Sequence, residues 1–237
     1  MRIPFVAVEP NAQSCSDCAV RLFGVCAALD KQEIDEFEHM SRHVHFATCE
    51  TVFAQEDATT SYYSVLDGVL RLYKLLPDGR RQIVGFALPG DFLGMTTAGR
   101  HGFSADAIGP VTVCQFSKAS FARFADGRAN LLRRINELAV RELNQARDHM
   151  VLLGRRSAEE KVATFLVGWR DRLAQLRGPS EVVPLPMGRQ DVADYLGLTI
   201  ETVSRTFTKL EREGVIEIMQ GGICLLDAAR AEALAAA

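Results

Sequence analysis

The chain has 237 residues, of which 48% are hydrophobic and 24% are charged, so it is long enough for one large domain or two ordinary ones. Its 30 acidic and 27 basic residues give a net charge of −3, which excludes a uniformly basic nucleic-acid coat but allows a local basic patch. No apolar run approaches the ~20 residues of a membrane span, and the N-terminus lacks the pattern of a signal peptide. We therefore expect a cytoplasmic protein with no membrane partner.

The first 30 residues are predicted to form a cysteine-rich segment. Three of the six cysteines, Cys15, Cys18 and Cys26, lie within it. In the reducing cytoplasm, this clustering indicates metal or redox chemistry rather than structural disulfides. Thiolates select zinc or iron–sulfur clusters, and the second close pair that a zinc ribbon usually brings is absent from the sequence. Three close cysteines with a distant fourth suit an iron–sulfur cubane better.

Residues 31–126 are predicted to form a β-roll, a jelly-roll-like sensor domain. A short amphipathic helix over 31–41 opens it, with Ile34, Phe37 and Met40 at steps of three. From residue 42 to about 118, short apolar runs alternate with turn residues, among which Pro77-Asp78-Gly79 is the clearest signal. Many short strands at such spacing indicate an all-β sandwich or barrel.

Residues 127–154 are predicted to form a long dimerisation helix. From residue 120 to 153, apolar residues recur at steps of three and four, close to a heptad seam. A helix packed on its own domain is the alternative, but the narrow seam favours a two-stranded dimer helix. The predicted seam residues are Leu132, Ile135, Ala139, Leu143, Ala146 and Met150.

Residues 155–237 are predicted to form a winged helix-turn-helix domain that binds double-stranded DNA. Ser157 and Glu160 form a capping box at the start of a helix, and Gly197 permits a tight turn between helices over 189–196 and 199–212. Two extended segments around residues 220–222 then indicate a β-hairpin wing. A helical pair that serves only packing is the alternative. The predicted DNA-contacting residues are Glu201, Thr202, Ser204, Arg205, Thr208 and Lys209.

The string QDVADYLGLTIETVSRTFTKLEREGVI resembles the helix-turn-helix of the CRP/FNR family of bacterial transcription regulators, and GVLRLYKLLPDGRRQIVGFALPGDFLGM is similar to that family's roll. The FNR branch, with its FnrN-, FnrL- and FixK-like members, is most similar. The resemblance implies an α+β chain that binds DNA as a homodimer and recruits RNA polymerase. It also implies that Glu201, Ser204 and Arg205 read the half-sites of a TTGAT-N4-ATCAA-like palindrome.

The resemblance further implies a [4Fe–4S] cluster, held by Cys15, Cys18, Cys26 and Cys114, that makes DNA binding respond to oxygen and controls anaerobic or microaerobic genes. The C-x-x-C-x7-C spacing looks like the FnrN/FnrL variant. Cys49, which we expect on an early strand, is the rival fourth ligand, and Cys224 is expected to be a packing residue. His39, His43 and His45 are expected to be surface or half-buried side chains rather than zinc ligands.

Three other functions remain as alternatives. The first is a regulator that responds to a cyclic nucleotide. It is not expected, because Asp91 follows Gly90 where the family has Glu, and the HGFSADAIG segment lacks the family's Arg-Ser pair. A FixK-like regulator without a cluster, switched by a thiol, is the closest rival. A thiol oxidoreductase using Cys15 and Cys18 lacks the βαβ setting of such motifs, so we do not expect an enzyme.

Overall fold

The computed structural model describes residues 14–236, so the first 13 residues of the predicted cysteine-rich segment lie outside the described part. The described chain forms two compact units, one of residues 14–75 and 84–143 and the other of residues 76–83 and 144–236. We call them the N-terminal and the C-terminal unit. Among the described residues, no helix is both long and apolar enough to cross a membrane.

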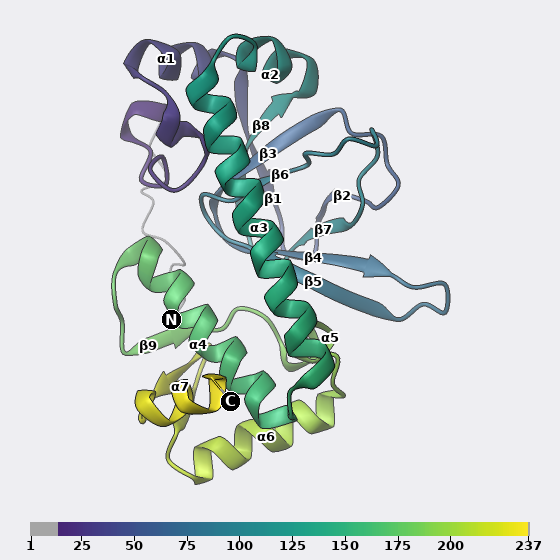
Figure 1. Ribbon diagram of the computed structural model, residues 1–237, viewed down its shortest axis with the longest axis vertical. Helices are drawn as coiled ribbons and strands as arrows, with labels where there is room; N and C mark the ends of the chain where they lie inside the picture. Colours follow the sequence, from purple (N-terminus) through teal and green to yellow (C-terminus); the bar gives the residue numbers. More distant parts are fainter. Residues whose placement is uncertain (1–13, 237) are drawn as a thin grey trace. The chain divides into compact units, whose positions relative to one another are not determined.

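The N-terminal unit is a β-roll preceded by short helical turns (Figure 1). Its helical elements are the 3₁₀ turns η1 (Cys15–Asp17) and η2 (Val25–Ala28) and the helices α1 (Lys31–His39) and α2 (Lys118–Ala125). Its strands are β1 (Ser41–Phe46), β2 (Thr51–Phe53), β3 (Ser61–Asp67), β4 (Leu70–Leu75), β5 (Arg81–Ala87), β6 (Phe92–Leu93), β7 (Ser104–Ala107) and β8 (Val111–Ser117). The first three residues of β5 belong to the C-terminal unit.

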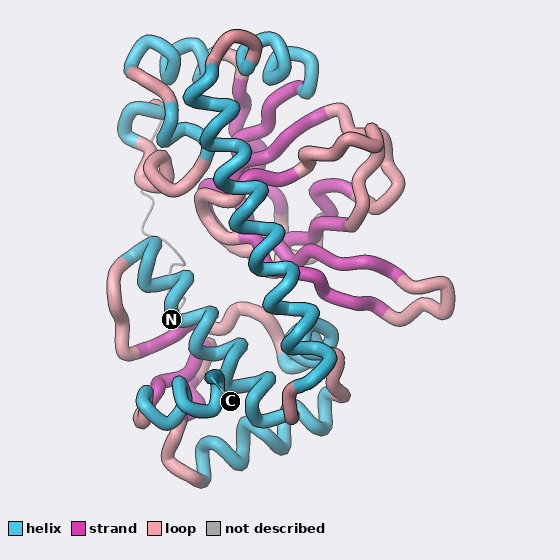
Figure 2. The backbone as a smooth tube through the Cα atoms, in the orientation of Figure 1, coloured by secondary structure: helices cyan, strands magenta, loops and turns pink. Residues whose placement is uncertain are grey.

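The strands form two four-stranded sheets, ordered β1-β8-β3-β6 and β2-β7-β4-β5. Both sheets contribute to one core, in which Val65 and Val113 of the first sheet and Leu70 and Ala105 of the second are fully buried. The strand and loop segments can be followed in Figure 2. The alternating apolar runs therefore give the jelly-roll-like β domain that the sequence predicts.

The long helix α3 (Ala129–Arg155) has 27 residues and is separated from α2 by a turn. Gly127 in that turn has a φ of +75°, a conformation that favours glycine. The helical periodicity from residue 120 onward thus covers two helices rather than one, because periodicity does not register a short break between two amphipathic segments.

The C-terminal unit carries the predicted winged helix-turn-helix. Its elements after α3 are α4 (Ala158–Arg177), β9 (Val182–Pro184), α5 (Arg189–Leu196), α6 (Ile200–Arg212), β10 (Ile216–Met219), β11 (Gly222–Leu225) and α7 (Ala228–Ala236). The sheet order is β10-β11-β9, so the predicted hairpin gains a third strand. The Ala-rich segment after the wing, for which no element is predicted above, forms α7.

Candidate nucleic-acid interface and cysteine cluster

The turn between α5 and α6 is built by local interactions. Gly197 ends α5 in the left-handed conformation, with φ at +62° and ψ at +40°. Thr199 caps the N-terminus of α6, and its Oγ1 accepts a hydrogen bond from the Thr202 backbone N–H at 3.2 Å. Ala193 of α5 and Val203 of α6 are fully buried, which lets the two helices approach closely. The helix-turn-helix that the sequence predicts is therefore present.

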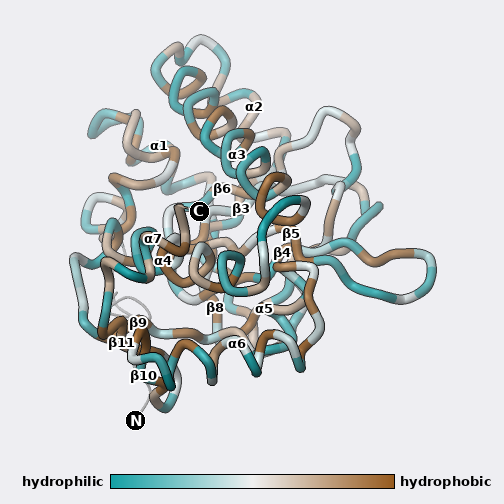
Figure 3. The backbone as a smooth tube through the Cα atoms, turned by 60° about the horizontal axis from the view of Figure 1, so that its bottom comes forward, coloured by the Kyte–Doolittle hydropathy of each residue, from teal (hydrophilic) through white to brown (hydrophobic). Residues whose placement is uncertain are grey.

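The hydropathy of α6 alternates along the helix (Figure 3), and its residues divide into a buried and an exposed face. Phe207 and Leu210 point into the core of the C-terminal unit. Of the six predicted DNA-contacting residues, four are exposed and two, Thr202 and Lys209, are half-buried. A shallow pocket on this face is lined by Ser204, Arg205, Thr208, Lys209 and Arg212. Side chains suited to base and phosphate contacts thus lie together on one helix face.

Two charged residues of α6 already have partners. Lys209 Nζ is engaged by the Glu159 carboxylate of α4 and lies 3.9 Å from Glu213 Oε1. The pKa of Glu201 is lowered, first by a backbone hydrogen bond at its own amide and then by the Thr199 hydroxyl. Arg205 contributes to the same lowering through its charge. Glu201 is therefore ionised at neutral pH and can accept a hydrogen bond from a base.

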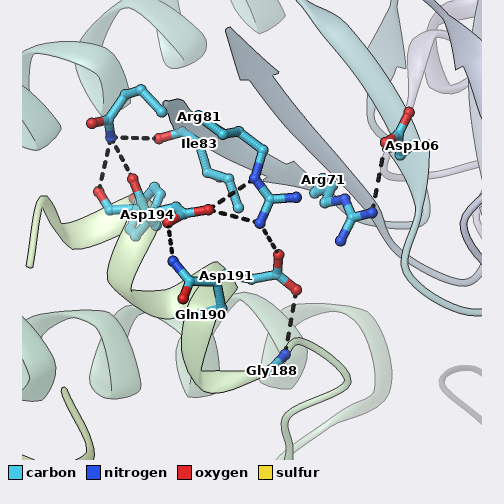
Figure 4. A network of polar contacts seen from close by, with 10 residues as sticks. Arg71, Arg81, Ile83, Asp106, Gly188, Gln190, Asp191 and Asp194 are labelled. Carbon is cyan, nitrogen blue, oxygen red and sulfur yellow. Dashed lines mark hydrogen bonds and ion pairs between the residues drawn. The ribbon is translucent and has the colours of Figure 1, made fainter. Parts of the chain in front are cut away.

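An arginine outside the helix-turn-helix positions α5 (Figure 4). Arg81 Nη2 donates to Asp191 Oδ1 at 2.7 Å, and its Nε donates to Asp194 Oδ2 at 2.8 Å. Next to it, Gln82 Nε2 donates to the Asp194 carbonyl oxygen at 2.6 Å. Burial acts to lower the pKa of Arg81, but the two carboxylates outweigh it, so that this pKa is raised. Sequence reasoning missed this network, because 110 residues or more separate its partners.

The helix α3 presents an exposed apolar row. Leu132, Leu143 and Met150 are 51%, 48% and 64% exposed, which is high for large apolar side chains. Ala139 and Ala146 lie on the same face and are exposed as well. We call these five residues the exposed row. The sixth predicted seam residue, Ile135, instead packs partly buried against the core of the N-terminal unit.

The four cysteines that resemble cluster ligands gather in one place of the N-terminal unit. Cys114 lies on β8, is 5% exposed and belongs to a core cluster against which Cys15 and Cys26 also pack. Cys15 lies in η1, where its backbone N–H donates to Glu38 Oε2 of α1 at 2.9 Å. Cys18 follows η1 and is half-buried. The fold thus brings the N-terminal triad to a strand that is almost 90 residues further along the chain.

Burial raises the pKa of all four thiols. The pKa of Cys15 is raised to about 11 and that of Cys26 to about 12, and burial is the largest cause for each. For Cys114, the charges of Cys15, Cys26 and Cys18 add to the effect of burial, which indicates one shared electrostatic environment. Within residues 14–236, however, no three His, Cys, Asp or Glu side chains form a ready-made site for a single metal ion.

The other candidate ligands lie elsewhere or have other roles. Cys49 is exposed in a turn after β1, with a φ of +67°, and not on a strand as the sequence suggested, because the chain reverses there. His39 Nδ1 lies 2.6 Å from the Asp35 carbonyl oxygen, and His45 Nδ1 lies 2.9 Å from Thr112 Oγ1. Cys224 lies half-buried in the wing strand β11.

Inside the roll, charged side chains pair with each other. Arg71 Nη2 of β4 lies 3.6 Å from Asp106 Oδ2 of β7, and both side chains are largely buried. Asp91 Oδ2 accepts a hydrogen bond from the Leu88 N–H at 2.8 Å, within the turn after β5. An anionic ligand in this region would compete with Asp106 for Arg71.

Comparisons with known proteins agree on one class. Residues 185–216 match the family model "Bacterial regulatory proteins, crp family", and residues 43–128 match the "Cyclic nucleotide-binding domain". The chain is 72% identical over its full length to the full-length nitrogen fixation regulation protein FixK of Bradyrhizobium diazoefficiens. It is 59% identical to the transcriptional activatory protein AadR of Rhodopseudomonas palustris, over 93% of this chain and 92% of that protein. The solved structure of FixK2 from Bradyrhizobium japonicum matches with a TM-score of 0.78 and 37% identity, over 83% of this chain and 98% of that one.

Proposed function

The chain belongs to the CRP/FNR family of bacterial transcription regulators, of the FixK/FNR type, and we propose that it is an oxygen-responsive activator. In this proposal, a homodimer binds TTGAT-N4-ATCAA-like palindromes at low oxygen and recruits RNA polymerase. A [4Fe–4S] cluster makes this binding respond to oxygen. The similarity to a nitrogen fixation regulation protein and to an activatory protein makes micro-oxic gene activation the expected output.

The gathering of Cys15, Cys18, Cys26 and Cys114 around one core is the observation that carries the proposal. Four cysteine thiols are the usual donor set of an iron–sulfur cluster. Because the thiolates bind different iron atoms of the cluster, they need not lie as close together as the ligands of a single metal ion. The donor set therefore fits. When bound, such a cluster supplies a group that dioxygen oxidises. With all four cysteines bound to the cluster, Cys15, Cys18 and Cys26 would hold the N-terminal segment to Cys114 on β8.

DNA reading rests on the exposed face of α6. Arg205 offers a guanidinium that can donate two hydrogen bonds to guanine O6 and N7, and Glu201 offers a carboxylate that can accept from cytosine N4. The exposed row of α3 supplies an apolar surface for a second copy, as expected of a family that binds palindromes. We propose that no cyclic nucleotide takes part, since Arg71 faces Asp106 instead of a free phosphate site.

Anaerobic purification tests the cluster. We expect iron and sulfide in equal amounts in the parent, with visible absorption that fades in air. Serine variants of Cys15, Cys18, Cys26 and Cys114 are each expected to lose iron and anaerobic DNA binding. Cys49→Ser and Cys224→Ser are the matched controls and should keep both. Retention of iron and DNA binding by Cys114→Ser would contradict the ligand assignment.

The 72% identity to FixK favours a second candidate, a regulator that is active without a cluster and is switched by a thiol. In that case the anaerobic parent would be colourless and free of iron, yet it would bind the palindrome. Its binding would then fall on treatment with a thiol oxidant, and one cysteine substitution would abolish that response. The absorption spectrum and the metal content separate the two candidates in one preparation.

A further inference from the structure

An arginine of α3 holds the loop that joins two of the candidate ligands. This loop, residues 19–25 between Cys18 and Cys26, we call the cysteine loop. Arg134 Nη2 donates to the Phe23 carbonyl oxygen at 2.8 Å, and its Nε donates to the Gly24 carbonyl oxygen at 3.1 Å. The third nitrogen, Nη1, lies 3.3 Å from Glu137 Oε2 on α3 itself. One side chain thus joins the loop to the helix.

The chemistry of arginine suits this role. Its planar guanidinium presents several donors in a fixed fork, so two neighbouring carbonyls can be held at once, whereas a lysine ammonium acts as a point charge. The Arg134 side chain is only 18% exposed, which limits competition from water. The contacts therefore fix the direction of the loop relative to α3 as well as its distance.

The cysteine loop is also confined on its other side. A Cβ atom added to Gly24 would stand 2.9 Å from the Gly90 carbonyl oxygen, in the turn after β5. A Cβ atom added to Gly90 would stand 2.7 Å from Phe23 Cβ. Val25, at the end of the loop, is fully buried in the core cluster that contains Leu131 of α3 and Cys114. The loop therefore cannot move far without breaking its bonds to Arg134.

Arg134 lies on the inner face of α3, on the side of the helix that faces away from the exposed row. Leu131 is fully buried and Leu138 packs against the same core, so these residues mark the inner face. Leu132, two positions before Arg134, begins the exposed row. Each residue turns an α-helix by about 100°, so Arg134 and Leu132 lie on opposite sides of α3. Because backbone hydrogen bonds join the turns of the helix, a rotation of the inner face also turns the exposed row. The contacts that hold the inner face therefore also set the direction in which the exposed row faces a second copy.

We propose that Arg134 is a positioning residue through which the state of the cysteine loop controls dimerisation by α3, an inference that rests on the proposed function. With the loop held by its cysteines, Arg134 keeps the first turns of α3 in the orientation that pairs the exposed rows of two copies. When the loop is released, both carbonyl contacts are lost and the dimer weakens.

A double-mutant cycle tests this coupling. The dimer dissociation constant is measured anaerobically by sedimentation for the parent, Arg134→Gln, Cys26→Ser and the double variant, with iron and sulfide determined for each. Arg134→Gln is expected to keep its iron and to weaken the dimer by about tenfold or more, from the loss of two hydrogen bonds of a charged group. In the Cys26→Ser background, where the loop is already released, the same change should have less than about a threefold effect.

Two further variants separate positioning from charge and from folding. Arg141→Gln removes the same charge one heptad later on the same face, at an exposed residue, and should behave like the parent. Arg134→Lys keeps the charge but not the fork and should give an intermediate dimer constant. A parent-like dimer in Arg134→Gln, or equal effects of that change in both backgrounds, would overturn the inference. An iron-free parent would instead contradict the cluster, and the dimer measurements would still decide the role of Arg134.

Discussion

Replacing Arg81 by methionine isolates the ion pairs that hold α5. Methionine keeps an unbranched stem of similar reach and removes the guanidinium. Asp191 and Asp194 then lose their arginine partner, although their side chains are only 11% and 14% exposed. Asp194 keeps the hydrogen bond from Gln190 Nε2 at 2.6 Å, and Asp191 keeps the longer one from the Gly188 N–H at 3.4 Å. The variant thus leaves two carboxylates poorly solvated rather than wholly without donors.

The expected loss of unfolding free energy is about 2–3 kcal/mol. Hydrogen bonds to charged groups contribute about 1.5–3 kcal/mol each, and removing one partner of a fully buried ion pair costs about 3–5 kcal/mol. Arg81 is itself 22% exposed, and residual solvation of the carboxylates reduces the loss below the fully buried case. With a urea dependence of about 1–3 kcal/mol per molar, the midpoint should fall by roughly 1 M.

Urea unfolding followed by tryptophan fluorescence measures this effect. Trp169 is the single tryptophan of the chain and is 3% exposed in α4, so its emission reports on the C-terminal unit. The adjacent Arg80 provides a matched control, because its pair with Asp78 is at the surface, with side chains 77% and 51% exposed. Arg80→Met should change the free energy by less than about 0.5 kcal/mol. Equal midpoints for the two variants would refute the reasoning.

Two further predictions concern the dimer and the DNA contacts. Met150→Glu should leave the protein folded but monomeric in anaerobic sedimentation, because it places a charge in the exposed row of both copies; Ile135→Glu should instead destabilise the N-terminal unit, since Ile135 packs into its core. A normal dimer in Met150→Glu would mean that α3 pairs through another face. Arg205→Ala should cost roughly 1–3 kcal/mol per half-site and remove the preference for guanine in TTGAT, while weak nonspecific binding survives in a gel shift. An undiminished preference for that guanine would show that Arg205 does not read it.

The sequence predicted those features whose signals are local. Ser157 and Glu160 lie three residues apart, and the structure has the reciprocal bonds of a capping box between them at 3.3 and 2.8 Å. The wing hairpin follows from Gly221, whose φ of +81° favours glycine. Gly197 marks the turn of the helix-turn-helix for the same reason. In each case the residue type that the backbone requires is itself visible in the sequence.

Features that depend on distant backbone groups escaped sequence reasoning. Arg134 and Phe23 are 111 residues apart, and the acceptor is a carbonyl that every residue carries, so no residue type signals the contact. Ile135 shows a related limit. A heptad pattern identifies apolar positions on α3, but only the folded roll decides that Ile135 faces the core while Leu132 and Leu143 stay exposed.

The pairing of Lys209 with Glu159 would make phosphate binding by Lys209 an exchange of one ionic partner for another. A lysine side chain without an ion-pair partner in the protein displaces a counterion from DNA when it binds a phosphate. This contributes about −0.9 to the slope of log K against the logarithm of the salt concentration. Lys209 must first leave Glu159, and that carboxylate then attracts a cation of its own. The cation gained by the protein offsets the one lost from the DNA. We therefore expect a phosphate contact of Lys209 to hold α6 on the DNA backbone with little effect on how steeply binding falls with ionic strength.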